Sequence, residues 1–169
     1  ANSAPVLGPV ADRTIQPGSL LVISNSASDA EVPPQVLTYL LVDGPASATI
    51  NLTNGVLTWL PTLTDAGTTN DFLVVVEDNG VPSLSATQTV WVTVSRPAQP
   101  VITAAGMSSG PFSLAVTGDA GPDYTLLAST NLSDWTPLWT TNPMVPPFLF
   151  VDPAATNFSR RFYRVLLGP

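Results

Sequence analysis

The side chains that could do chemistry in this sequence are its carboxylates. The 169 residues include twelve Asp and Glu but no His and no Cys, and all five basic residues are Arg, so Lys is absent too. Without imidazole, thiol or amine groups, a Ser-His-Asp triad, a thiolate nucleophile, a thiolate zinc site and a Schiff base are all excluded. A pair of catalytic carboxylates, as in glycosidases, or oxygen ligands for a hard cation such as calcium remain.

The spacing of the acids argues against catalysis. The adjacent acids Glu77 and Asp78 end a predicted strand, so their side chains point to opposite faces and do not suggest a catalytic pair. Twelve acids against five Arg, a net charge of −7, would repel the phosphates of nucleic acid. We therefore expect a protein that is not an enzyme and has no nucleic-acid partner.

Short apolar blocks that alternate with polar residues, bounded by Pro, Gly, Asn and Asp, predict an all-β chain without helices. Asn54-Gly55 predicts a tight hairpin turn. The expected strands of the first half are Leu20–Ser24, Val36–Val42, Ala48–Asn51, Val56–Leu60, Asp71–Glu77 and Thr87–Ser95. Those of the second half are Val101–Ala105, Phe112–Thr117, Tyr124–Ser129, Trp135–Thr140, Pro147–Val151 and Arg161–Leu167.

The segment Arg96-Pro97-Ala98-Gln99-Pro100 is typical of a short, stiff linker. It predicts two β-sandwich domains, residues 1–97 and residues 98–169. The second is small and has no disulfide, so we expect it to pack against the first domain or against another chain.

No apolar run reaches the ~20 residues of a membrane span. The first residues, Ala1-Asn2-Ser3, are compatible with a mature end after signal removal, and we expect an extracellular or cell-surface protein.

Charge is unevenly divided between the halves. Residues 1–97 carry eight acids and two Arg, whereas residues 98–169 carry four acids and three Arg. Those three, Arg160, Arg161 and Arg164, lie at the start of the last predicted strand or within it. An acidic end and a locally basic end favour head-to-tail contacts between copies. Alternatively, the three Arg only keep an edge strand soluble.

The tryptophans offer further candidate contacts. Trp59 is expected in the core, but Trp91 alternates with Val90, Val92 and Val94 and should point outward, as an interface or beneath the second domain. Trp135 and Trp139 share one parity with Pro137, which indicates an edge strand. This pair is expected to form a sugar platform, an assembly contact or the core of the small domain.

Residues 2–95 resemble the cadherin-like, putative Ig or dystroglycan-type domains of bacterial surface proteins. The motifs that carry the resemblance are Asn2-Ser3-Ala4-Pro5, Ala27-Ser28-Asp29-Ala30-Glu31, Leu37-Thr38-Tyr39, Asn54 to Thr62 and Val76 to Ser85. Residues 111–167 resemble a C-terminal module of secreted Verrucomicrobia-type proteins, through Tyr124 to Trp135, Asp152-Pro153 and Arg161-Phe162-Tyr163-Arg164-Val165.

The cadherin-like resemblance implies calcium at a junction between domains. Its ligand positions correspond here to Asn2, Asp29, Glu31 and Asp78. Glu31 departs from the usual second Asp, and the linker after residue 95 lacks the usual acidic motif, so this chain would hold half a site. A neighbouring chain would supply the other half, with Asp134 or Asp152 as donors. Alternatively, these acids are ordinary turn residues.

Together these patterns predict a non-catalytic extracellular structural protein that assembles with copies of itself, head to tail, into a surface layer or filament. The alternative is a carbohydrate-binding or adhesion module of a larger secreted protein, with polysaccharide or a cell surface as its partner.

Overall fold

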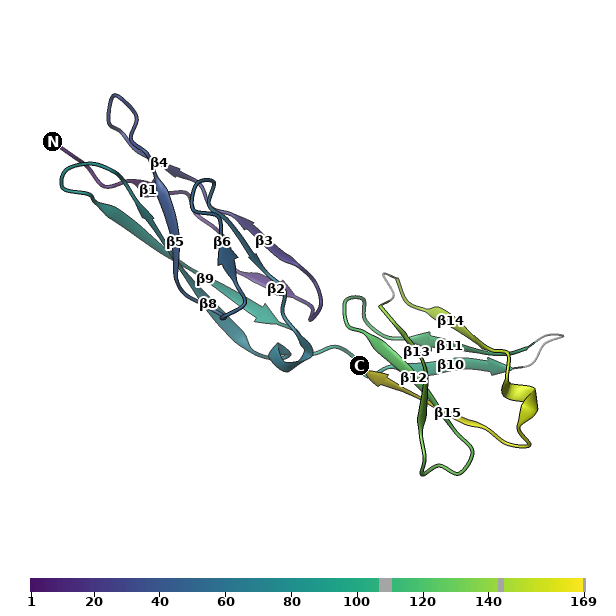
Figure 1. Ribbon diagram of the computed structural model, residues 1–169. Helices are drawn as coiled ribbons and strands as arrows, with labels where there is room; N and C mark the ends of the chain where they lie inside the picture. Colours follow the sequence, from purple (N-terminus) through teal and green to yellow (C-terminus); the bar gives the residue numbers. More distant parts are fainter. Residues whose placement is uncertain (107–110, 143–144, 169) are drawn as a thin grey trace. The chain divides into compact units, whose positions relative to one another are not determined.

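A computed structural model describes residues 1–106, 111–142 and 145–168, and it is built almost entirely of β-strands (Figure 1). The chain divides into two compact units. The first consists of Ala1–Ile15 and Ser19–Ser95, and the second consists of Gln16–Gly18 and Arg96–Pro169. The all-β fold class is confirmed. A boundary at residue 97 between two independent domains stays a prediction.

The first unit contains a four-stranded sheet, a three-stranded sheet and one short strand pair. The larger sheet has the order β2 (Arg13–Ile15), β9 (Ser85–Val94), β8 (Thr69–Glu77) and β5 (Thr38–Asp43). Strand β2 runs parallel to β9, and the other neighbours are antiparallel. The smaller sheet has the order β3 (Leu21–Ser24), β7 (Val56–Trp59) and β6 (Thr49–Ile50), and β1 (Val6–Leu7) pairs with β4 (Ala27–Ser28).

The core of the first unit lies between its two larger sheets. Val90, Val92 and Val94 point inward and are at most 1% exposed, whereas Trp91 between them is 49% exposed, as the alternation predicts. The opposite sheet contributes Trp59, also buried as predicted, whose ring meets the Phe72 ring edge-on at 5.4 Å between centroids. This contact joins the two sheets into a sandwich.

The second unit is also a two-sheet sandwich. One sheet has the order β10 (Val101–Gly106), β11 (Phe112–Thr117) and β14 (Phe148–Asp152), and the other has the order β13 (Thr136–Thr141), β12 (Tyr124–Ser129) and β15 (Phe162–Leu167). Every residue of β12, the central strand, is buried. Aromatic pairs bridge the sheets, such as Phe112 with Tyr163, stacked at 4.9 Å.

All twelve predicted strand segments coincide with strands of the structure, to within a few residues at their ends. The prediction missed β1, β2 and β4, which are only two or three residues long and too short to show alternation. The described residues also form two single 3₁₀ turns, η1 (Leu63–Asp65) and η2 (Ala155–Asn157). Within the described ranges, no helix has the length and apolarity needed to cross a membrane.

The turn at Asn54-Gly55 is wider than predicted. Strands β6 and β7 are joined by a loop in which the Gly55 N–H donates to the Asn51 carbonyl at 2.9 Å and Asn51 Oδ1 accepts from the Thr53 and Asn54 N–H groups. Gly55 adopts a φ of 68°, and a Cβ there would lie 2.6 Å from the Asn25 carbonyl oxygen. The glycine is therefore required, but in a longer loop than a two-residue hairpin turn.

The shared parity predicted for Trp135, Pro137 and Trp139 is wrong. Strand β13 is an edge strand, as Pro137 indicates, but Trp135 lies before it. Trp139 pairs with Leu126 and Pro137 pairs with the next residue, Leu127, because the register shifts between them. Consecutive residues of β12 point to opposite faces, so this β-bulge places Pro137 and Trp139 on opposite faces.

Adjacent residues of β3 provide a test of the core. Ile23 is 2% exposed and Val22 is 53% exposed. Replacing Ile23 by Ala should lower the free energy of unfolding of the first unit by about 2–5 kcal/mol, because it removes buried methyl groups and leaves a cavity. The matched change Val22→Ala should cost less than about 1 kcal/mol. Urea denaturation, monitored by hydrogen exchange of the β9 amides, measures the free energy of unfolding of both variants. Equal losses of stability would contradict the assignment of Ile23 to the inward face.

Candidate metal site

Three segments that are distant in sequence meet at one end of the first unit (Figure 1). They are the residues before β1, the β4–β5 connection and the β8–β9 connection. Asn2 ties the first to the last, because its Nδ2 donates to Asp78 Oδ2 at 2.9 Å and to the Pro82 carbonyl at 2.8 Å. All four residues predicted as calcium ligands lie in these segments.

Asp78 organises the β8–β9 connection from a buried position. It is 5% exposed, and its Oδ1 accepts from the N–H groups of Gly80 and Leu84 at 2.9 and 3.0 Å. Burial tends to raise the pKa of Asp78, but the bonds from Leu84, Gly80 and Asn2 outweigh it and hold this pKa below its ordinary value. Asp78 is thus an ionised carboxylate whose two oxygens already accept hydrogen bonds.

Asp29 and Glu31 face each other across the turn at Ala30. Asp29 Oδ1 accepts from the Ala30 N–H at 2.7 Å, and Glu31 Oε1 accepts from both the N–H and the hydroxyl of Ser3 at 2.6 Å. A hydrogen bond between the two carboxyl groups raises the pKa of Asp29 and, with the bonds from Ser3, lowers that of Glu31 to about 2. Protonation of one carboxyl group is therefore linked to that of the other.

When both carboxyl groups are ionised, three buried oxygens in this region accept no hydrogen bond. They are Asp29 Oδ2, Glu31 Oε2 and Gln35 Oε1. The Gln35 amide is oriented by its Nε2, which donates to Asn2 Oδ1 at 2.5 Å. Leaving buried acceptors unpaired is costly, so this group of oxygens is suited to bind a positive ion.

The three unpartnered oxygens are of the chemical type that a hard cation prefers. Carboxylate and amide oxygens are calcium ligands, and a cation between two carboxylates relieves their repulsion. No set of three or more Asp, Glu, His or Cys side chains within the described ranges is placed to hold a metal. A site here would need a further oxygen, and the unpartnered Gln35 Oε1 is the candidate. Sequence reasoning missed Gln35, because nothing in the sequence distinguishes this amide from the others.

The second unit has its own buried polar centre, around Asp152. Arg161 Nε lies 3.1 Å from Asp152 Oδ2, and the Tyr163 hydroxyl donates to the same oxygen at 2.8 Å. Burial and the Asp152 carboxylate together raise the pKa of Tyr163 to about 12. Asp152 is 4% exposed, so it is not available to a calcium ion on a neighbouring chain. Its predicted role as a donor is therefore wrong, whereas Asp134 is exposed.

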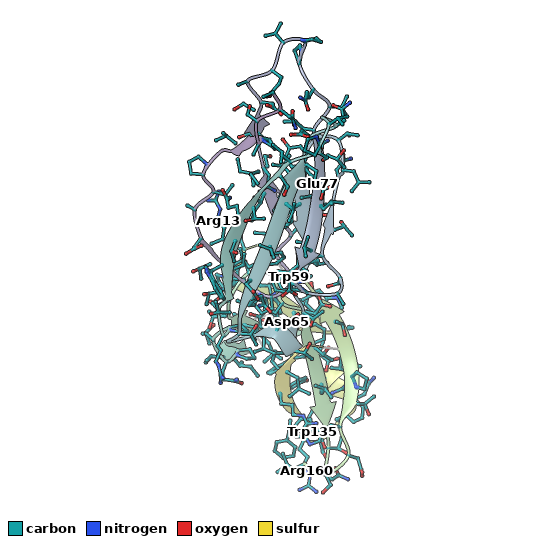
Figure 2. All side chains as sticks on the ribbon, turned by 90° about the vertical axis from the view of Figure 1, so that its left-hand side faces the viewer. Arg13, Trp59, Asp65, Glu77, Trp135 and Arg160 are labelled. Carbon is teal, nitrogen blue, oxygen red and sulfur yellow. The ribbon has the colours of Figure 1, made fainter. Side chains whose placement is uncertain are left out.

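The predicted interface arginines fall into different environments. Arg160 is exposed and lies outside β15, whereas Arg161 is held by Asp152 and lies over the Phe158 ring at 4.3 Å. Arg164, exposed on β15, lies 4.3 Å above the Trp135 ring. Trp135 and Arg160 appear at the same end of the second unit in Figure 2.

The structure separates the two tryptophans of the predicted sugar platform. Trp139 packs against Phe148 and Phe150 of the facing sheet, with centroids 5.9 and 5.7 Å away. Trp135 instead contacts Arg164 on the outer face. On the first unit, the Trp91 side chain stays exposed, and the Trp91 backbone N–H donates to Asp12 Oδ1 at 2.9 Å.

No protein-family model and no curated protein matches the chain. Solved structures with a similar arrangement include the protocadherin GammaB4 extracellular domain, with a TM-score of 0.44, 15% identity and coverage of 70% of this chain and 32% of that one. Mouse cadherin-23 EC22-24 has a TM-score of 0.44, 18% identity and coverage of 75% and 49%. An endo-fucoidan hydrolase of glycoside hydrolase family 107 has a TM-score of 0.47, 18% identity and coverage of 75% and 21%.

The chain thus spans less than half the length of each of these proteins. At these scores the likeness assigns neither a family nor a function to the chain. The candidate site therefore depends on the geometry of its own residues.

The Asp152 centre gives a stability test. Replacing Arg161 by Met should lower the free energy of unfolding of the second unit by about 3–5 kcal/mol, because it leaves a buried carboxylate without its counter-charge. The matched change Arg160→Met removes an exposed charge and should cost less than about 0.5 kcal/mol. Thermal and urea denaturation compare the two variants. Equal stabilities would show that the Arg161–Asp152 pair does not support the fold.

Proposed function

We propose that this chain is a non-catalytic, extracellular structural protein whose first unit binds calcium at its N-terminal end. The observation that carries the proposal is the set of three unpartnered buried oxygens, Asp29 Oδ2, Glu31 Oε2 and Gln35 Oε1. Hydrogen-bond donors already occupy the other oxygens of the two carboxylates. The free oxygens are left to bind a cation.

In this proposal Asp29, Glu31 and Gln35 contact the ion, and Asn2 and Asp78 hold the three segments in place. Asn2 contributes by bonding both Gln35 and Asp78. The ion would neutralise the repulsion between the carboxylates and stabilise this end of the unit. Calcium suits the site better than magnesium, because it accepts irregular oxygen sets, whereas magnesium demands a near-ideal octahedron.

The same site motivates head-to-tail assembly. Calcium takes six to eight oxygens, and the three free side-chain oxygens leave positions for water or for a neighbouring copy. The first half of the chain is acidic, and Arg160 and Arg164 are exposed cations of the second unit. Trp91 offers an exposed aromatic contact. A repeated contact of this kind between unlike surfaces makes a filament or surface layer when it does not close on itself. A bacterial cell surface is the setting that the sequence motifs favour.

Calcium binding is tested by thermal stability. In the full chain freed of metal by a chelator, calcium at 10–100 times Kd should stabilise the first unit by about 1.4–2.7 kcal/mol. We expect Kd of order 10⁻⁴–10⁻³ M, as for extracellular modules. Asp29→Asn should abolish the calcium-dependent shift in Tm. Asp43→Asn is the matched control, since Asp43 Oδ1 also accepts from the N–H of the next residue, at 2.9 Å.

If calcium leaves the Tm of the unmodified chain unchanged, calcium binding is contradicted. A shift that survives Asp29→Asn would place the ion elsewhere.

Assembly is tested separately by light scattering and negative-stain electron microscopy of the full chain with and without calcium. We expect filaments or sheets in calcium and fewer of them after Arg160→Glu or Trp91→Ser, because these changes reverse a charge or remove an exposed apolar surface. A monodisperse monomer at high concentration in both conditions would contradict assembly and leave calcium binding standing.

A further inference from the structure

A cleft of about 350 Å³ lies in the second unit, beside the end of β12. The turn that follows β12, the start of β13 and the segment between η2 and β15 form its walls. Its polar and aromatic lining includes Ser129, Asn131, Asp134, Thr136, Phe158 and Arg161. None of these residues belongs to the proposed calcium site, which lies in the first unit.

The turn that forms one wall is held rigid by its own hydrogen bonds. Ser129 Oγ accepts from the N–H groups of Asn131 and Leu132 at 3.1 and 2.8 Å. Asn131 Oδ1 accepts from the N–H groups of Ser133 and Asp134 at 3.0 and 2.9 Å. Leu132 adopts a left-handed φ of 66°, which these bonds stabilise. A wall that is ordered before binding costs little entropy when a ligand arrives.

Asn131 also places the carboxylate of the cleft. Its Nδ2 donates to Asp134 Oδ2 at 2.7 Å, which orients the Asp134 side chain. Asp134 is exposed to solvent, so it is accessible to a ligand. An oriented carboxylate is a strong acceptor for hydroxyl donors.

Arg161 and Phe158 form a second wall of the cleft. The Arg161 side chain is only 11% exposed and its Nε is occupied by Asp152, yet its Nη1 is buried without a hydrogen-bond partner. The guanidinium lies 4.3 Å from the centre of the Phe158 ring, and Phe158 is itself 42% exposed. The cleft therefore combines one oriented acceptor and one exposed aromatic ring with a guanidinium that Asp152 holds in place.

Charge decides which ligand suits this combination. Asp152 already neutralises Arg161, and Asp134 adds a negative charge at the cleft, so a carboxylate or sulfate ligand is disfavoured. A sugar hydroxyl donates to Asp134, while an apolar C–H face of the ring rests on Phe158. We propose that this cleft binds a neutral saccharide.

The proposal goes beyond calcium binding and is independent of it. It also differs from a platform made of Trp135 and Trp139, because Trp139 packs against Phe148 and Phe150 and Trp135 packs against Arg164.

The experiment is an NMR titration of the isotope-labelled full chain, in chelator, with neutral gluco-, xylo- and manno-oligosaccharides at millimolar concentration. We expect chemical-shift changes in the Ser129–Asp134 turn and in Thr136 for at least one sugar. Asp134→Asn should weaken that binding about tenfold or more, because it removes the charge from a hydrogen-bonded acceptor. Phe158→Ala should weaken it as well.

Asp123→Asn is the matched control and should leave the affinity unchanged. Asp123 Oδ1 accepts from the Asn142 amide at 2.8 Å, much as Asp134 accepts from Asn131, but it does not line the cleft. The proposal is overturned if no neutral sugar shifts these residues, if Asp134→Asn binds as well as the unmodified chain, or if only sulfated or uronic sugars or acidic peptides bind.

Discussion

The account depends on one electrostatic constraint, the gathering of oxygen acceptors at the N-terminal end of the first unit without enough donors to satisfy them. Asp29 and Glu31 shift each other's pKa, and when both are ionised each keeps one buried oxygen without a hydrogen-bond donor. Gln35 presents a third such oxygen because Asn2 binds its amide nitrogen. Folding places these groups together although they repel each other, and a cation is the partner that turns this repulsion into attraction.

The second unit is a small sandwich that is stabilised without disulfides. Its central strand β12 is buried on both faces, and aromatic rings such as Phe112 and Tyr163 stack between its sheets. Asp152 is buried with both Arg161 and Tyr163 bonded to it, so the charge is compensated inside the unit. Arg161 also lines the cleft, so a structural ion pair and a candidate binding surface share a residue.

The fold was more predictable from sequence than the sites were. Strands that bury one face can be predicted from the alternation of inward and outward residues, as in β9, where Trp91 points outward between inward valines. Strands of two residues are too short to show this pattern. The bulge that turns Trp139 inward is invisible in the sequence, because it depends on how β13 pairs with β12. Likewise Arg161 resembles any surface arginine until the fold brings Asp152 beside it. The acids at the metal site were found from a motif, but the neutral Gln35 offered no comparable signal.

A high-resolution crystal structure of the full chain grown in calcium would show whether an ion binds Asp29 and Glu31. We expect a strong density peak about 2.3–2.6 Å from Asp29 Oδ2, Glu31 Oε2 and Gln35 Oε1, with the remaining ligands supplied by water or a neighbouring copy. Ordered water alone at ordinary hydrogen-bond distances of about 2.7–3.2 Å, or side chains of Asp29 and Glu31 turned apart into solvent, would contradict it.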